Sequence, residues 1–327
     1  DRLAAMVSSL LERPLLVITE SPRQAEEIWE PVQTFFNLLA SDRQAGRPQL
    51  LPALDVLPFQ GLSPHTEISE ERAVGLWRLA TERVPVTITP VAGALLRTED
   101  AGFYRQLALS LAAGDEVPFE EVVDHLYAIG YQKRDPVEMV GEFSVRGGIL
   151  DVFSPRSPRP VRIEFLGDLI ESVRLFDVES QRSVPKVAHC TLLPLVEHPA
   201  SPGLLQRLRE IAGRERAAGE EESFPGWEFL TPLVRQREGS LVDLMERPVV
   251  VWVEPEGARR AADRLWERLE EGSASHPCPP ERAFWRWEEW RRPLASQAQV
   301  SLSEITLGVP ETAGQVRTRP AMAFHGN

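Results

Sequence analysis

Charged and apolar residues alternate within the segment 141–177, and this pattern could present arginine and glutamate side chains to another molecule. Two sets interleave there, with Val161, Ile163 and Phe165 on one side and Arg162, Glu164 and Leu166 on the other. This period of two is typical of a strand with one buried face. Arginine and apolar anchors carry most of the energy of protein interfaces, so the outward side suits docking of a partner. A solvated sheet face with scattered leucines is the alternative interpretation.

The neighbouring residues predict a small antiparallel sheet. Gly147 and Gly148 bend the chain beside Arg146, and Gly167 with Asp168 closes a two-residue hairpin. The predicted register pairs Leu166 with Leu169, Glu164 with Glu171 and Arg162 with Val173. The opposite side, which we expect to face the core, carries Val161, Ile163, Phe165, Ile170 and Phe176. Because facing glutamates repel each other unless a cation lies between them, the outward face is better suited to a partner than to isolation.

Units of a strand followed by a helix precede this sheet. A helix-like segment, 3–12, leads into the apolar run 14–19, and Ser21 with a following proline opens a second helix. A helix over 68–80 and a strand over 84–89 repeat the arrangement, which indicates an open parallel α/β sheet. A buried strand over Val249–Val253, followed by another helix, returns to this pattern near the C-terminus.

The change of pattern near residue 114 predicts a domain boundary. We expect four parts: 1–113 as the first part of an α/β domain, 114–194 as an inserted α+β domain, 195–316 as the second part of the α/β domain, and 317–327 as a linker. The helix expected over Phe119–Ile129 opens the inserted part, and Gly130 is expected to end it.

Several chemistries find no support in the sequence. A phosphate-binding P-loop needs GxxxxGK[ST], and no such run occurs; the lysines are only Lys133 and Lys186. The carboxylates of Glu254 and Glu256 follow a buried strand, but a proline separates them. The two cysteines lie far apart without CxxC spacing, so neither a zinc site nor a disulfide framework is indicated. We therefore expect no enzymatic activity, no metal and no cofactor.

Composition narrows the class of protein. The 327 residues carry a net charge of −13, which disfavours autonomous binding to a phosphate backbone. No apolar run approaches the ~20 residues that cross a bilayer, and no signal peptide is apparent. We expect a cytoplasmic protein with no membrane partner.

Two stretches resemble bacterial transcription-repair coupling factors (Mfd). The first is FSVRGGILDVFSPRSPRPVRIEFLGDLIESVRLFDVESQRS, and the second is LDVLPFQGLSPHTEISEERAVGLWRLAT at residues 54–81. The resemblance covers nearly the whole chain and identifies it with the N-terminal UvrB-homology module of that family. It implies a degenerate helicase-like body, RecA-like as in UvrB domain 1, with an inserted smaller α+β domain and no nucleotide hydrolysis.

The resemblance also implies a function in nucleotide excision repair. The inserted domain would recruit UvrA by imitating UvrB, thereby coupling stalled transcription to DNA repair. Arg146, Arg162 and Leu166 match the family's UvrA-binding positions, where a phenylalanine is expected instead of Leu166; Phe165 and Glu164 beside them are further candidates. RNA polymerase and DNA would be partners of the full protein through regions absent from this chain. An ATP-dependent DNA helicase, or a fragment that binds damaged DNA as UvrB does, is the alternative.

Overall fold

The body of the molecule is a five-stranded parallel sheet. The structure is a computed structural model that describes residues 13–39, 46–180, 183–214, 223–274 and 276–303. The strands are β1 (Leu15–Thr19), β2 (Gln49–Leu50), β3 (Val86–Pro90), β12 (Val249–Val253) and β13 (Ala298–Leu302), in the order β13-β12-β1-β3-β2. The central strands β1 and β3 are fully buried, as their continuous apolar runs predict.

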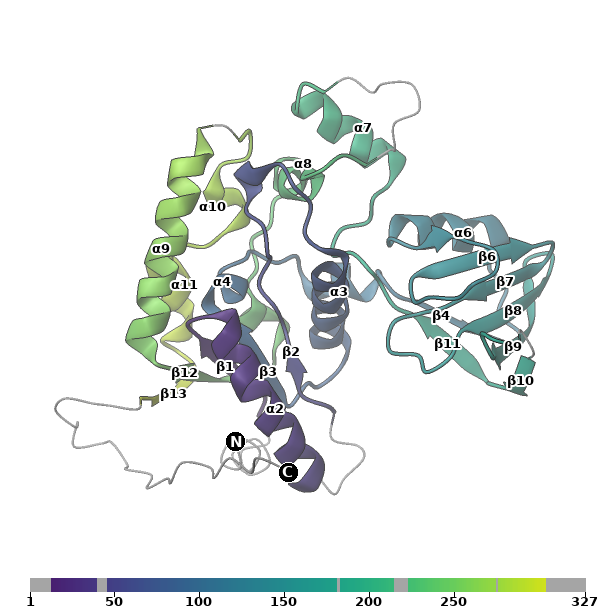
Figure 1. Ribbon diagram of the computed structural model, residues 1–327, viewed down its shortest axis with the longest axis horizontal. Helices are drawn as coiled ribbons and strands as arrows, with labels where there is room; N and C mark the ends of the chain where they lie inside the picture. The colour runs from purple at the N-terminus through teal and green to yellow at the C-terminus, as the bar shows by residue number, and fades with distance from the viewer. Residues whose placement is uncertain (1–12, 40–45, 181–182, 215–222, 275, 304–327) are drawn as a thin grey trace, which may run out of the picture.

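Helices cover both faces of this sheet (Figure 1). One face packs against α2 (Pro22–Leu39), with Leu15 and Val17 of β1 in that core. The other face packs, through Leu16 and Ile18, against α3 (Thr66–Thr81), α4 (Val91–Ala94), α9 (Pro255–Ser273) and α11 (Trp287–Leu294). Alternate residues of one strand thus serve two cores, because successive side chains point to opposite faces of a sheet.

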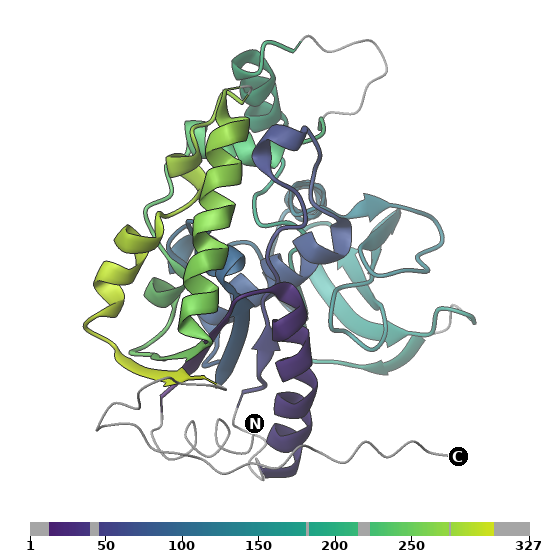
Figure 2. The same ribbon diagram turned by 60° about the vertical axis from the view of Figure 1, so that its left-hand side comes forward.

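Shorter elements complete the body. They are α5 (Ala101–Arg105), α7 (Pro202–Ile211), α8 (Thr231–Val234), α10 (Pro280–Ala283) and the 3-10 turns η1 (Pro58–Gln60), η2 (Trp227–Leu230) and η3 (Leu241–Leu244). Figure 2 shows α7 at the end of the molecule farthest from α2.

A second, smaller unit lies beyond α3, away from α9 (Figure 1). Its sheet has the order β10-β9-β8-β7-β6-β5, formed by β5 (Gln132–Lys133), β6 (Glu142–Arg146), β7 (Ile149–Val152), β8 (Val161–Leu166), β9 (Leu169–Phe176) and β10 (Ser183–Lys186). Helix α6 (Phe119–Ala128) packs on its inner face, and β4 (Leu109–Ala112) pairs with β11 (His189–Leu192) where the chain enters and leaves. The predicted fold class, a parallel-sheet body with an inserted α+β domain, is confirmed.

Some predictions fall outside what the structure describes. The helix expected at 3–12 and the linker at 317–327 lie outside the described residues. The division at residues 113 and 194 stays a prediction. Within the described ranges, no helix is both long and apolar enough to cross a membrane.

The hairpin of β8 and β9 carries a β-bulge that the predicted register lacks. The bulge falls between Glu164 and Phe165, where Glu171 is the extra residue of β9. The observed pairs are Leu166 with Leu169, Phe165 with Ile170, Glu164 with Ser172, Ile163 with Val173, and Arg162 with Arg174. The predicted pairing at the turn is confirmed, whereas Glu171 and Val173 are wrong as the partners of Glu164 and Arg162.

The apolar pattern of β9 explains the bulge. Ile170 and Val173 are three residues apart, so strict alternation would expose one of them, whereas the bulge lets both reach the core. The bulge also corrects the placement of Phe176. We expected its ring on the core side, but it lies on the outer side, under the guanidinium of Arg162, and is buried there.

Candidate partner-binding surface

The carboxylate of Asp151 organises the outer face of the smaller sheet. Strand β7 places Asp151 directly between Ser144 of β6 and Arg162 of β8. Nε and Nη2 of Arg162 donate to its two oxygens, both at 2.7 Å, and Nη2 of Arg146 donates to Oδ2 at 3.1 Å. Only 2 % of the Asp151 side chain is exposed. Because a buried carboxylate needs a compensating cation, this one acid holds the two predicted arginines together.

Arg162 is held by the carboxylate of Asp151 and by the ring of Phe176. Its two hydrogen bonds to Asp151 form the fork geometry that suits a carboxylate, and its guanidinium carbon lies 4.8 Å from the ring centroid of Phe176. The bonds to Asp151 raise the pKa of Arg162 above its ordinary value. With only 16 % of its side chain exposed, Arg162 offers a partner one edge of the guanidinium, in a preset orientation.

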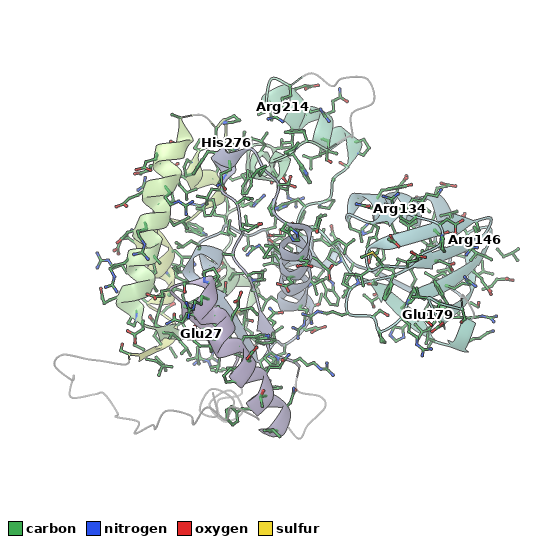
Figure 3. All side chains as sticks on the ribbon, viewed as in Figure 1. Glu27, Arg134, Arg146, Glu179, Arg214 and His276 are labelled. Atoms are coloured by element: carbon green, nitrogen blue, oxygen red, sulfur yellow. The ribbon has the colours of Figure 1, made fainter. Side chains whose placement is uncertain are left out.

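Arg146 is the more accessible of the two arginines. It ends β6, and half of its side chain, 51 %, is exposed. Gly147 follows with φ of +61°, the left-handed region in which glycine is favoured, and so turns the chain directly after it. Figure 3 shows Arg146 on the part of the smaller domain that lies away from the body, where a second protein could approach it.

The tip of the β8–β9 hairpin adds exposed apolar side chains at the same end of the sheet as Arg146. Leu166 is 66 % exposed and Leu169 is 38 % exposed. A hydrogen bond connects this tip to the turn at Gly147 and Gly148 that follows Arg146. In it, the backbone N–H of Phe165 donates to the carbonyl of Gly148 at 2.7 Å. A guanidinium and two leucines therefore share one end of the sheet, which is the combination expected of interface anchors.

The other two candidate residues have supporting positions. Phe165 is 8 % exposed, and its ring meets that of Phe119 edge-on in the core below the sheet, with the ring centroids 5.0 Å apart. Glu164 accepts a hydrogen bond from Ser172 at 2.5 Å and lies 3.5 Å from Arg174. The repulsion between facing glutamates that we expected is therefore replaced by an ion pair.

Asp151 is the residue that the sequence analysis missed. A lone carboxylate within the apolar run Ile149–Val152 was the available signal. Its burial could be read only from a three-stranded register, since Asp151 has Ser144 on one side and Arg162 on the other.

The carboxyl ends of the parallel strands are where open α/β sheets bind nucleotides, and here Glu20 follows β1 at that edge. Only Glu20 and Ser21 separate β1 from α2, which is too short a connection for a phosphate loop. The carboxylate of Glu20 lies against Gly257 near the start of α9, where a larger side chain would collide with it. In the described part of the chain, no group of three His, Cys, Asp or Glu side chains could hold a metal ion.

Comparisons with known proteins give one family and several relatives. Residues 109–198 match the family described as the UvrB interaction domain. The chain is 33 % identical over 324 residues to a transcription-repair-coupling factor of Mycobacterium bovis, and 31 % identical over 320 residues to that of Myxococcus xanthus. These matches take in 95 % and 89 % of this chain, and the Escherichia coli protein matches 63 % of it at 29 % identity. The chain spans about a quarter of the length of the first two relatives, 25 % and 27 %.

Proposed function

We propose that the smaller domain of this chain, which belongs to the transcription-repair-coupling factor family, is an adaptor that binds UvrA. The chain corresponds to the UvrB-homology module of that family. Binding of UvrA would bring the excision-repair machinery to stalled transcription. The observation that carries the proposal is the pair of arginines held on Asp151 beside the exposed Leu166 and Leu169. Residues 109–198, which contain all of these side chains, match the UvrB interaction domain.

The two arginines have different roles in this proposal. Arg146 contacts the partner directly, because half of its side chain is open to solvent. Arg162 balances the charge of the Asp151 carboxylate and presents a partly covered guanidinium next to Asp151. RNA polymerase and DNA are proposed as partners of the longer protein, through regions outside this chain, and its place of action is the cytoplasm.

Arg146→Ala is expected to weaken binding to purified UvrA by about 30-fold, which corresponds to roughly 2 kcal/mol for a central interface arginine. The fold should persist, since Asp151 keeps both hydrogen bonds from Arg162. Isothermal titration calorimetry measures the affinity, and circular dichroism checks the fold.

Arg159→Ala is the matched control. Arg159 is also an exposed arginine of this domain, but it precedes β8 at the end of the sheet opposite Arg146. Its loss should leave the affinity within about twofold, because charges away from an interface contribute little. Equal affinities for wild type and Arg146→Ala would refute the proposed contact.

Leu166→Ala is expected to reduce UvrA affinity by about fivefold, close to 1 kcal/mol for the contact area that the side chain would bury. Stability should not change, because Leu166 is 66 % exposed and lies outside the core. Met139→Ala gives the comparison, since Met139 is 68 % exposed in the same domain, beyond the other end of β6. A loss of equal size in both variants would mean that Leu166 has no specific role.

The adaptor is further proposed to have no catalytic activity. This proposal is supported by the short connection between β1 and α2 and by the carboxylate of Glu20, which would repel a phosphate at that edge. A helicase fragment would instead hydrolyse ATP faster when DNA is added, and a UvrB-like fragment would bind DNA in a strongly salt-dependent manner. Assays of ATP turnover and of duplex binding between low and moderate salt separate these alternatives.

A further inference from the structure

A small cavity lies where the chain returns from the smaller domain to the body. It has a volume of about 50 Å³, which is room for a few waters or one small ion. Ser69 of α3, the returning residues Glu197 and His198, and the buried arginine Arg237 all line it, with Glu228 of η2. The cavity thus lies at the junction of the two units and apart from the surface around Arg146.

Arg237 is buried beside this cavity and is incompletely bonded. Only 8 % of the residue is exposed, and its Nε has no hydrogen-bond partner among the described residues. Its Nη2 donates to the hydroxyl of Thr231 and, at 3.5 Å, to the carbonyl of Glu228. An arginine stays protonated when buried, so this group carries a full charge next to an open space.

The nearest carboxylates, those of Glu99 and Glu197, act on Arg237 only from a distance, because each is paired with another arginine. Arg72 is paired with Glu197 through bonds of 2.5 and 3.3 Å, and Arg235 is paired with Glu99 at 3.1 Å. No carboxylate of the described residues lies within ion-pair distance of Arg237.

Glu228 and His198 also line the cavity, and Glu228 forms no ion pair with Arg237. The Glu228 carboxylate accepts a hydrogen bond from Ser63 at 2.9 Å, and burial raises its pKa. Burial, followed by the charge of Arg237, holds the pKa of His198 well below its ordinary value, so its imidazole is neutral. A buried cation without a partner is costly, and a bound anion would remove that cost.

We propose that this cavity binds one small oxyanion, of the size of inorganic phosphate or sulfate, with Nε of Arg237 as its principal donor. The neutral His198 and the hydroxyl of Ser69 line the same space and can each donate one further hydrogen bond. The small volume suits the free ion better than a nucleotide, whose base and ribose would need further space. Its position at the junction means that binding would also brace the segment Val196–His198 against α3.

Thermal unfolding with added sodium phosphate tests the site. Ionic strength is kept constant with sodium gluconate, whose anion is too large for the cavity. We expect about 10 mM phosphate to raise the unfolding midpoint of the wild type by about 3 °C and to leave that of Arg237→Met unchanged. Phosphate also stabilises proteins weakly through exclusion from their surfaces, so a variant control is needed.

Arg97→Met is that control. Arg97 also has a buried Nε without a partner, but it stacks on Trp285 and does not line the cavity. It should keep the full phosphate response. No response in the wild type, or an equal response in Arg237→Met, would overturn the proposal.

A cavity-filling variant decides the matter if Arg237→Met does not fold. Ser69→Leu keeps Arg237 and adds an apolar side chain to the cavity from the first turn of α3, and leucine is a good helix former. It should abolish the phosphate response, and a retained response would count against an ion in this cavity.

Discussion

Arg162→Ala is expected to lower the free energy of unfolding by about 3 kcal/mol, because it leaves the buried carboxylate of Asp151 with a single, weaker partner. The variant loses both 2.7 Å hydrogen bonds and the contact with the ring of Phe176. Arg146 remains 3.1 Å from Asp151, which keeps the loss near the lower end of the range for broken buried pairs. Urea unfolding followed by circular dichroism measures the change.

Two comparisons test whether the unpaired carboxylate of Asp151 causes the loss of stability. Arg174→Ala removes an arginine one third exposed, 33 %, from a surface pair with Glu164, and should cost less than about 1 kcal/mol. Adding Asp151→Ala to Arg162→Ala should restore part of the lost stability, because the unpaired charge is then gone. If Arg162→Ala is no more harmful than Arg174→Ala, the Asp151 pairing does not stabilise the domain.

The loss of stability expected for Arg162→Ala would also contribute to any change in UvrA binding measured with that variant. Loss of UvrA affinity in Arg162→Ala would combine a missing contact with a weakened sheet, whereas loss in Arg146→Ala would report mainly the contact, because Asp151 keeps both hydrogen bonds from Arg162. Arg162→Lys separates the two effects for the inner position. Lysine keeps a charge near Asp151 but lacks the planar fork that makes two parallel hydrogen bonds.

The alternation of apolar and polar residues along β8 was sufficient to predict which of its side chains face the core and which face outward. Val161, Ile163 and Phe165 are buried, and Arg162 faces outward, because a period of two leaves no other choice once one face is a core. The same reasoning failed in β9 because Ile170 and Val173 cannot both be buried without a bulge, and a bulge has no simple sequence signal.

The body shows the same division between local and long-range information. The apolar runs of β1, β3 and β12 were predicted, since buried parallel strands are continuously apolar. The edge strand β13 was missed because all five of its residues are exposed, so its sequence carries no apolar run. Strand order and the cavity at Arg237 depend on contacts between distant segments, which local patterns do not contain.

The glycine pair after Arg146 gives the second large effect. A Cβ at Gly148 would lie 2.5 Å from the carbonyl oxygen of Phe165, so the backbone of β8 would have to move. The movement would also strain the 2.7 Å hydrogen bond from the N–H of Phe165 to the Gly148 carbonyl. Gly148→Ala is therefore expected to cost about 3 kcal/mol, at the upper end for a single added methyl group in a packed site.

Gly147→Ala is the contrasting substitution. A Cβ there meets nothing within 4 Å, so only the left-handed φ of +61° opposes it, at a cost of about 1 kcal/mol. Since Gly148 joins the Arg146 turn to the hairpin that carries Leu166, its substitution should also reduce UvrA binding more than Gly147→Ala does. Denaturant unfolding and calorimetry on both variants test this order, and equal losses would mean that the two turns are not mechanically linked.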